Sequence, residues 1–584
     1  VDVTVTTAEG TIKLPSAYEY IPDFPEIDLG MLGSHGFILE SDPAWLMGES
    51  VALGDLTGDG IDDLVVGLRR LGDLSSLKVL ITPGSPLLPE SLSALFPSSG
   101  QSVVENLVGM SYFPVGVYVL GDLNGDRLGD LGIGMDQGGG YILFGRQEFP
   151  ETVDIEREVK ERRAARLQRL AEGADPVSLG LSMAPLGGVE GDGLSRFAVG
   201  VSETDLTGAI PNAGEIHFLR ATDSWPESVD LSSADLVNSR VHGVDGGCGR
   251  GFRVLAGGDV NGDGVADLLA SCGEVIDINN RVFLLHGSPE PPGEVDVLTY
   301  IETVGGSVLE LPDRATERSP DEVIHVAAAG DVNRDGFADI LVGDVLGGSL
   351  QHGVTFLVFG ARDLPRLLSL PRIADPPDGV VRIFGESSYT QAASVGPAGD
   401  FNADGFSDFL IAAHDPLITP PGVFFLIVGK PELPPRIDLA RLGGQGIRIR
   451  GRHPMTQPQV PVQRAGDLNG DGALDVVFSE ASRIPRSGAI YVVYGQMASF
   501  RRGDANRDGN VDVADAVFLL GRLFLGNQAP MCEDGADAND DGRLELTDAV
   551  VLLQHLFLAG PALPPPYPEP GNDPSKDRLG CSAF

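Results

Sequence analysis

Six short acidic strings carry the residue types in this sequence that are best suited to binding a metal ion. Each places oxygen-bearing side chains at positions 1, 3, 5 and 9 of a nine-residue loop, usually with glycine at position 6, as in "DVNGDGVAD" from residue 259. A tight turn with this spacing directs alternate side chains toward one point, and the backbone carbonyl of position 7 adds another oxygen. Oxygen-only ligands with three carboxylates favour Ca²⁺ over zinc, copper or Mg²⁺.

The predicted ligands repeat from loop to loop. They are Asp55, Thr57, Asp59, Ile61 and Asp63; Asp122, Asn124, Asp126, Leu128 and Asp130; Asp259, Asn261, Asp263, Val265 and Asp267; Asp331, Asn333, Asp335, Phe337 and Asp339; Asp400, Asn402, Asp404, Phe406 and Asp408; and Asp467, Asn469, Asp471, Ala473 and Asp475. A set of Asx-type turns without metal is the alternative. Six matching copies favour the metal.

A seventh, degenerate string shows that the pattern is a repeat of the whole chain. "GVEGDGLSR", from Gly188, lacks the first aspartate and places Arg196 at position 9, so we expect its guanidinium to replace the cation. The seven strings follow one another at intervals of 66 to 72 residues. A fixed long period over most of a chain indicates a repeat architecture, and seven near-equal units indicate a propeller.

The segments between the loops are typical of strands. Each loop continues into an apolar stretch such as "DILVG", and a later apolar stretch ends at glycine, as in "TFLVFG" at 355–360. Over residues 24–500 this arrangement resembles the FG-GAP repeats of integrin α-subunit propellers and of similar bacterial extracellular proteins. The resemblance implies a mainly β fold, a seven-bladed β-propeller in which Ca²⁺ clamps a hairpin of each competent blade.

The N-terminus is expected to close the ring. "PPRIDLARLGGQGIRIRG" at 434–451 has no counterpart after the last blade, but "FPEIDLGMLGSHGFILES" at 24–41 matches it in spacing. We therefore expect residues 24–41 to supply the outer strand of blade seven, which removes a sheet edge. Residues 1–23 form an N-terminal extension whose "VDVTVTT" predicts a strand. This strand either pairs with its own propeller or is donated to another molecule.

Residues 156–173, "EREVKERRAARLQRLAEG", have helical periodicity and predict a helix between blade strands. They carry six basic residues: Arg157, Lys160, Arg162, Arg163, Arg166 and Arg169. A solvated helix is one interpretation. In so acidic a chain, a contact for the acidic face of a neighbour is the other.

Two twelve-residue loops near the C-terminus follow the EF-hand pattern, with aspartate in place of the usual final glutamate. Their predicted ligands are Asp504, Asn506, Asp508, Asn510, Asp512 and Asp515 in the first loop, and Asp537, Asn539, Asp541, Arg543, Glu545 and Asp548 in the second. Each loop precedes an apolar helix. The duplicated unit resembles a type I dockerin, assigned to residues 501–560, and the resemblance implies two further Ca²⁺ sites and a cohesin partner.

Two features of this unit qualify the resemblance. Loop positions 10 and 11, a polar recognition pair in many cellulosomal dockerins, are Val513-Ala514 and Leu546-Thr547 here, so its helices could instead pack against the propeller or a second copy. The tripeptide "RGD" at 502–504 contains the first ligand of a calcium loop. We therefore give adhesion through this tripeptide little weight.

The cysteines and the tail complete the domain organisation. Residues 561–584 are expected to form a proline-rich arm. Two local cysteine pairs, Cys248 with Cys272 and Cys532 with Cys581, suggest two disulfides in an oxidising compartment, and four reduced thiols are the alternative.

Composition limits the compartment and the partners. The formal charge of −43 disfavours nucleic acid and anionic membranes, and no apolar run approaches the roughly 20 residues of a membrane span. Because the chain begins at Val1 without a methionine, we interpret it as a processed, exported product that is extracellular or on the cell surface.

Three functions fit these observations, and no catalytic motif stands out. The first is a non-enzymatic structural protein with about eight Ca²⁺ ions that assembles with itself, in a homo-oligomer or filament, through its N-terminal strand and dockerin-like region. The second is an adhesive or glycan-binding propeller anchored to a cohesin-like domain. The third is a calcium-dependent polysaccharide lyase or hydrolase, because a propeller fold alone does not exclude an enzyme.

Overall fold

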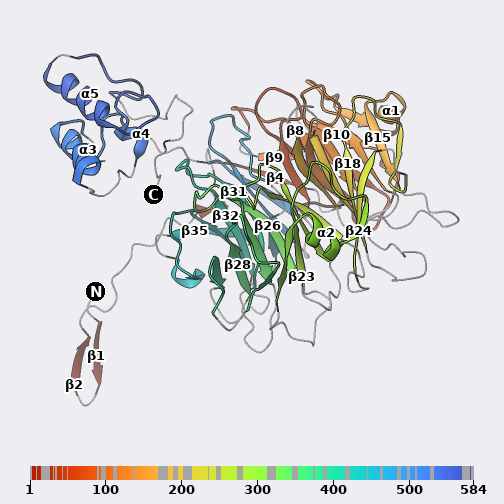
Figure 1. Cartoon of the computed structure of the whole chain (residues 1–584), viewed down its shortest axis with the longest axis horizontal. Helices are drawn as coiled ribbons and strands as arrows, with labels where there is room; N and C mark the ends of the chain where they lie inside the picture. Colours follow the sequence, from red (N-terminus) through yellow and green to blue (C-terminus); the bar gives the residue numbers. More distant parts are fainter. Residues whose placement is uncertain are drawn as a thin grey trace.

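The computed structural model is mainly β and forms a seven-bladed propeller followed by a small helical unit (Figure 1). The structure describes residues 3–7, 10–14, 27–29, 32, 36–41, 44–48, 50–88, 91–93, 100–109, 115–135, 139–168, 182–188, 195–201, 214–233, 236–244, 252–272, 281–311, 324–344, 353–371, 375–385, 391–414, 421–442, 445–454, 456–460, 464–482, 488–495, 500–506, 510–525, 530, 532–558, 560–568 and 579. The expected fold class is confirmed.

Each blade is an antiparallel sheet of four main strands. In order from first to outer strand they are β6 (Val51–Gly54), β7 (Asp63–Arg70), β8 (Leu77–Thr82) and β10 (Ser102–Glu105) in blade one, where β5 (Trp45–Leu46) also pairs with β7; β11 (Gly116–Gly121), β12 (Asp130–Gly134), β13 (Gly140–Leu143) and β15 (Ala164–Gln168) in blade two; β16 (Ser182–Gly188), β17 (Ser195–Val201), β18 (Glu215–Arg220) and β20 (Val237–His242) in blade three; and β21 (Phe252–Gly258), β22 (Asp267–Cys272), β23 (Arg281–Leu285) and β25 (Gly306–Glu310) in blade four. The three remaining blades are β26 (Ile324–Gly330), β27 (Asp339–Asp344), β28 (Val354–Val358) and β30 (Val380–Phe384); β31 (Gln391–Gly399), β32 (Asp408–His414), β33 (Pro421–Ile427) and β35 (Gly446–Pro454); and β36 (Thr456–Gln459), β37 (Val476–Ser482), β38 (Gly488–Val493) and β4 (Gly36–Glu40).

A short fifth strand links each blade to the next. It comes from the segment just before the next outer strand and pairs parallel to the outer strand of the preceding blade, as Thr152–Asp154 does with Val103–Glu105. These strands are β14 (Thr152–Asp154), β19 (Ser228–Asp230), β24 (Glu294–Asp296), β29 (Leu367–Ser369), β34 (Arg436–Asp438), β3 (Ile27–Asp28) and β9 (Ser91–Ser93). The fifth strand covers the edge of its sheet, which limits pairing with foreign strands.

The aspartate that ends several of these strands begins a helix. Asp154 caps α1 (Ile155–Lys160), Asp296 caps α2 (Val297–Thr303), and Asp438 caps the 3₁₀ turn η4 (Leu439–Arg441), in each case by accepting backbone N–H groups. An aspartate at this position satisfies donors that lack an intrahelical partner. The chain therefore turns sharply from the fifth strand of one blade into the outer strand of the next.

The N-terminal segment closes the ring over two blades. β4 pairs antiparallel with β38 from Val493↔Gly36 to Ala489↔Glu40, and the preceding β3 pairs parallel with β35 of blade six. Phe37 and Leu39 of β4 are fully buried in a core that blades six, seven and one share. The other cores likewise lie between neighbouring blades.

The predicted helix over 156–173 is wrong from Glu161 to Gln168, and residues 169–173 lie outside the described part. α1 ends at Lys160, Arg162 has a φ of 59°, and Ala164–Gln168 forms β15, the outer strand of blade two. The segment forms a strand despite its helical periodicity, because β15 pairs with a strand on each side. This pairing satisfies its backbone hydrogen bonds and buries Ala164, Ala165 and Leu167. Arg163 pairs with Glu158 and Arg166 pairs with Glu156, so these two cations are neutralised within the chain.

The segment 1–23 contributes a hairpin of its own. β1 (Val3–Thr7) pairs antiparallel with β2 (Gly10–Leu14), and among the described strands neither pairs with a blade. Residues 15–26 lie outside the described part.

Two N-terminal truncations test the closure. Removing residues 1–41 deletes β3 and β4 and leaves the edge of β38 and the shared core open, so we expect loss of a single cooperative unfolding transition. Removing residues 1–23 spares both strands, so its melting temperature should stay within a few degrees of the full chain. Circular dichroism melts in Ca²⁺ measure both. Equal effects of the two truncations would contradict the closure.

Candidate calcium-binding loops

The acidic loops connect the first and second strands of their blades. In each of the six, the aspartate at position 9 pairs across the hairpin with the glycine just before position 1, as Asp339 does with Gly330. Positions 4 and 6 have positive φ in all six, for example 71° at Gly262 and 85° at Gly264. Glycine dominates these two positions because the left-handed conformation carries no steric cost for it.

The position 9 carboxylate holds the loop to the far end of its blade. Its Oδ2 accepts the N–H of position 2, and its Oδ1 accepts the N–H of the glycine that ends the third strand, at 2.8 Å in both cases for Asp339. All six copies make both bonds, at 2.7 to 3.1 Å and at 2.8 to 3.0 Å respectively. All six side chains are fully buried.

This arrangement explains the glycine at the end of each "FG" strand. A Cβ on Gly145 would lie 2.4 Å from the carbonyl oxygen of Gly129, and one on Gly360 would lie 2.4 Å from that of Ala338. Any side chain there would push the strand end away from the loop. The strand motif and the acidic loop are therefore two halves of one contact.

Backbone hydrogen bonds join neighbouring loops at five of the seven junctions of the ring, as far as the described residues show. The position 1 carbonyl accepts the position 8 N–H of the next loop, from Asp55 to Gly129 at 3.0 Å and from Asp331 to Ser407 at 3.0 Å. The last loop bonds to the first, because Asp62 donates its N–H to the Asp467 carbonyl at 2.9 Å. These bonds connect the hairpins of neighbouring blades at their loop ends.

Negative charge is concentrated in each loop. Burial raises the pKa of Asp130, Asp267, Asp339 and Asp475 to about 7 and that of Asp63 to about 6, and it raises the pKa of Asp408 well above its usual range. The backbone N–H donors oppose this shift, and the carboxylates at positions 1 and 5 add to it. A divalent cation at this point would favour the ionised form of all three.

The described residues contain no group of three or more His, Cys, Asp or Glu side chains placed to hold a metal ion jointly. The position 9 carboxylate is occupied by backbone N–H groups, while the carboxylates at positions 1 and 5 also accept loop N–H groups, as Asp259 and Asp263 do. The donors are nevertheless oxygen atoms of the kind that Ca²⁺ prefers. Coordination by all six complete loops stays a prediction.

The degenerate loop differs as its sequence suggests. Residues 189–194 lie outside the described part, but Arg196 occupies the position 9 place at the start of β17. Its Nη1 donates to the carbonyl of Pro289 in the next blade at 2.5 Å. At position 9, blade three therefore has a guanidinium that contacts the next blade, whereas the six complete loops have a carboxylate at this position.

The helical unit contains α3 (Val513–Leu525), α4 (Glu533–Ala536) and α5 (Leu546–Phe557), and its second loop uses the same turn as the propeller loops. Asp540 and Gly542, at positions 4 and 6, have φ of 59° and 74°. The fully buried Asp548 accepts the Glu545 N–H through Oδ2 at 2.8 Å, and its Oδ1 makes no hydrogen bond. Burial and the charge of Asp537 raise the pKa of Asp548 to about 7. A buried carboxylate oxygen without a donor fits Ca²⁺ in this second loop.

The first loop of the unit is described only in part, because Asp508 lies outside the described residues. Asp515 is fully buried and accepts the N–H groups of Asn506 and Asp512 at 3.1 and 2.8 Å. It holds the loop closed as Asp548 does in the second copy.

The tripeptide "RGD" is structural. Arg502 is fully buried and donates to the carbonyls of Asp534, Asp537 and Pro565 at 2.9 to 3.1 Å. The segment that follows α5 packs back on the same unit, with Leu563 buried in its core. The helical unit therefore continues past the expected boundary at 560, and its sequence gave no signal of this because proline-rich segments lack a periodic pattern.

The cysteine predictions are only partly described. Cys532 is disulfide-bonded, and its predicted partner Cys581 lies outside the described residues. Cys248 and the side chain of Cys272 also lie outside them.

Fold and loops together define a seven-bladed β-propeller with repeated acidic loops, joined to a dockerin-like module, and comparison with known proteins agrees. Residues 47–67 match the FG-GAP repeat and residues 502–557 match the dockerin type I domain. No helix in the described part of the chain is long and apolar enough to cross a membrane.

Two integrin α subunits are similar to part of the chain. Integrin alpha pat-2 of Caenorhabditis elegans is 26% identical over 208 residues, which is 34% of this chain and 16% of that protein. Integrin alpha pat-2 of Caenorhabditis briggsae is 24% identical over 231 residues, 39% of this chain and 17% of that protein. The chain thus matches less than a fifth of the length of these relatives. A solved structure of Aleuria aurantia lectin with alpha-methyl-L-fucoside covers 66% of this chain and 96% of its own at 10% identity, with a TM-score of 0.30.

Metal removal should make stability depend on pH. A carboxyl whose folded pKa lies near 7, against 3.8 in the unfolded chain, binds more protons when folded, so stability falls as pH rises through that interval by up to about 1.4 kcal/mol per group and pH unit. We expect the metal-free chain to melt at higher temperature at pH 5.5 than at pH 7.5. Saturating Ca²⁺ should raise the melting temperature at pH 7.5 and remove this difference. A pH-independent melt without Ca²⁺ would contradict the argument.

The position 9 contact can be tested at one residue. In Asp339→Asn, one of the two oxygens becomes an NH₂ group, which faces a buried backbone N–H that has lost its acceptor. We therefore expect the free energy of unfolding to fall by about 1–3 kcal/mol. The exposed Asp378→Asn is the matched control and should change it by less than about 0.5 kcal/mol. Urea denaturation in Ca²⁺ compares the two. Equal stability of both variants would show that the carboxylate is not a structural connector.

Proposed function

We propose that the chain is an extracellular, calcium-stabilised binding protein whose dockerin domain attaches it to a cohesin-type module of another protein. The dockerin match supports this, because dockerin domains bind cohesin partners. In this proposal the propeller is the rigid part that the attachment displays, and the chain is not an enzyme.

The observation that carries the proposal is a duplicated apolar surface on the helical unit, here called the dockerin face. It consists of four pairs of exposed apolar side chains, each pair separated by 33 residues: Val513 and Leu546, Val517 and Val550, Phe524 and Phe557, and Leu525 and Leu558. Val517 and Val550 are 62% and 41% exposed, and Phe524 and Phe557 are 67% and 65% exposed. In all four pairs, both copies of the duplicated unit therefore expose an apolar side chain to solvent, which is unfavourable.

Covering such side chains gains free energy. Burial of apolar surface contributes about 25 cal/mol per Å², so a partner that covers two phenylalanines and several aliphatic side chains gains several kcal/mol before the costs of association. Val513 and Leu546 stand at loop position 10, where many cellulosomal dockerins carry a polar residue. The expected cohesin-type partner therefore presents an apolar rather than a polar contact at these two points.

Self-assembly into a filament stays a separate prediction. The described part of the N-terminal extension pairs β1 with β2, and none of the comparisons bears on association between copies. The polysaccharide lyase or hydrolase alternative has no catalytic constellation to support it in the sequence. Turnover on a panel of acidic and neutral polysaccharides would overturn the non-enzymatic proposal.

The dockerin face can be tested with two charged substitutions. Val517→Asp combined with Val550→Asp places a charge in each half of the face, and we expect at least about tenfold weaker binding to a recombinant type I cohesin module. The exposed Leu87→Asp in the propeller is the matched control and should bind like the original chain. Surface plasmon resonance in Ca²⁺ over a panel of cohesin modules measures this, with size-exclusion chromatography reporting any association between copies.

Binding to no module of the panel would count against a cohesin partner. So would equal binding by the double variant and the control. Concentration-dependent oligomers that the double variant abolishes would instead favour a second copy of the chain as the occupant of the face.

A further inference from the structure

A cavity on the propeller axis carries positive charge in an otherwise acidic chain. It is lined mainly by the first strands of five blades, β6, β11, β21, β26 and β31. The other lining residues are Ser271 of β22, Ser50 just before β6 and Val460 just after β36. Two of its lining side chains, Arg253 and His325, are basic, and none of the described lining residues is acidic. The whole chain has 84 acidic and 41 basic residues. The charge of this cavity wall is therefore opposite in sign to the net charge of the chain.

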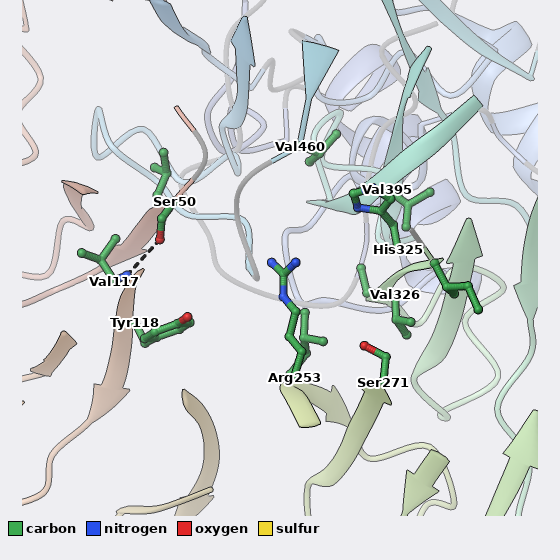
Figure 2. A pocket seen from close by; sticks show the side chains of 13 residues that line it. Ser50, Val117, Tyr118, Arg253, Ser271, His325, Val326, Val395 and Val460 are labelled. Carbon is green, nitrogen blue, oxygen red and sulfur yellow. Dashed lines mark hydrogen bonds between the residues drawn. The ribbon is translucent and has the colours of Figure 1, made fainter. Parts of the chain in front are cut away.

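Arg253 is the centre of this wall. It lies on β21 opposite Ser271 of β22, and Figure 2 shows its guanidinium directed into the cavity between Tyr118 on one side and His325 on the other. Other described arginines are paired with carboxylates: Arg146 lies 2.9 Å from Glu158, and Arg281 lies 3.1 Å from Glu310. Arg253 has no ion pair and no hydrogen bond with the described part of the chain.

The surrounding groups complement an anion. Figure 2 shows the Ser271 hydroxyl beside Arg253, and Ser50 across the cavity accepts the Val117 N–H at 2.9 Å, which leaves its own hydroxyl proton available to donate. Burial, together with the charge of Arg253, lowers the pKa of His325 to about 4. The imidazole is therefore neutral at pH 7 and offers one N–H donor. The valines of the wall keep the cavity narrow and partly apolar, which strengthens charge interactions within it.

We propose that this axial cavity is a binding site for a compact oxyanion group, a sulfate or a carboxylate, held by the Arg253 guanidinium. A guanidinium presents a planar fork of N–H donors that matches two oxygens of such a group. The hydroxyl of Ser271 and the imidazole of His325 supply further donors from the neighbouring strand and the neighbouring blade. The site is independent of the dockerin face, so the propeller has a ligand of its own whether or not the dockerin domain binds a cohesin-type module.

The size of the cavity limits the ligand. Its volume of about 50 Å³ accommodates a single small group, so a polymer could insert only a terminal or pendant anionic group. The guanidinium would bind free sulfate, free acetate and the carboxylate of an acidic sugar such as glucuronate in the same way, by donating N–H groups to two of their oxygens. These three compounds therefore separate a free ion from a sugar-borne carboxylate as the natural source.

Isothermal titration calorimetry of the full chain in saturating Ca²⁺ tests the site, with sodium sulfate, sodium acetate and sodium glucuronate titrated at constant ionic strength. Phosphate is avoided because it precipitates calcium. We expect one saturable site per chain. Arg253→Gln should weaken binding by about tenfold or more, equivalent to about 1.4 kcal/mol. Arg441→Gln, on an exposed arginine of η4 away from the cavity, is the matched control and should leave affinity unchanged.

A second pair of variants protects the test against misfolding. Arg253→Lys keeps the charge and loses the fork, so it should bind more weakly than the original chain and more tightly than Arg253→Gln. His325→Gln keeps a donor and should have a smaller effect than Arg253→Gln. Circular dichroism melts verify that each variant is folded. Saturable binding of glucuronate alone would assign the site to an acidic sugar, and binding of all three would assign it to the oxyanion group itself.

Two results would overturn the proposal. One is the absence of saturable heat with all three compounds. The other is equal binding by Arg253→Gln and Arg441→Gln, which would mean that any bound anion lies elsewhere on the chain.

Discussion

The buried carboxylate at position 9 of each acidic loop is the contact on which the propeller depends. It accepts one N–H from its own loop and one from the glycine that ends the third strand, so a single side chain joins three segments of a blade. Its burial is unfavourable for a charge without compensation. The two backbone donors supply part of that compensation, while burial still raises the pKa of Asp339 to about 7. A divalent cation at the predicted site would provide the remainder and would couple metal binding to folding.

Two separate sets of contacts close the ring of blades. On one side, backbone bonds join neighbouring loops at five of the seven junctions among the described residues, and one of them, from Asp62, connects the last loop to the first. On the other side, a fifth strand from each unit pairs with the preceding blade, and β3 and β4 complete this series with residues from the start of the chain. Blade three has lost the carboxylate, and Arg196 bonds across to Pro289 instead. Continuity of the ring therefore survives where the metal-type loop does not.

The same turn serves a different purpose in the helical unit. In the propeller, the loop connects two strands of one blade: its position 9 is buried, whereas its middle positions are exposed, as at Asp59 and Gly60. In the dockerin domain, the loops hold two short helices together around a small core, and the duplicated apolar side chains at their outer positions remain exposed. The proposed attachment and the proposed ligand binding therefore lie on different parts of the chain. The dockerin face is apolar and external, whereas the axial cavity is basic and enclosed.

The loops, the number of blades and the dockerin domain followed from the sequence because each depends on residues close together in the chain, at fixed spacing. Position 9 was found as a candidate ligand, yet its bond to Gly360 joins residues 21 positions apart and was not visible. The strand at Ala164–Gln168 was mistaken for a helix because its periodicity is local, whereas its pairing with β13 and β19 is not. Arg253, His325 and Ser50 belong to three blades, so only the closed ring brings them to one cavity. Spacing determined the local turns; tertiary pairing determined which distant residues share a site.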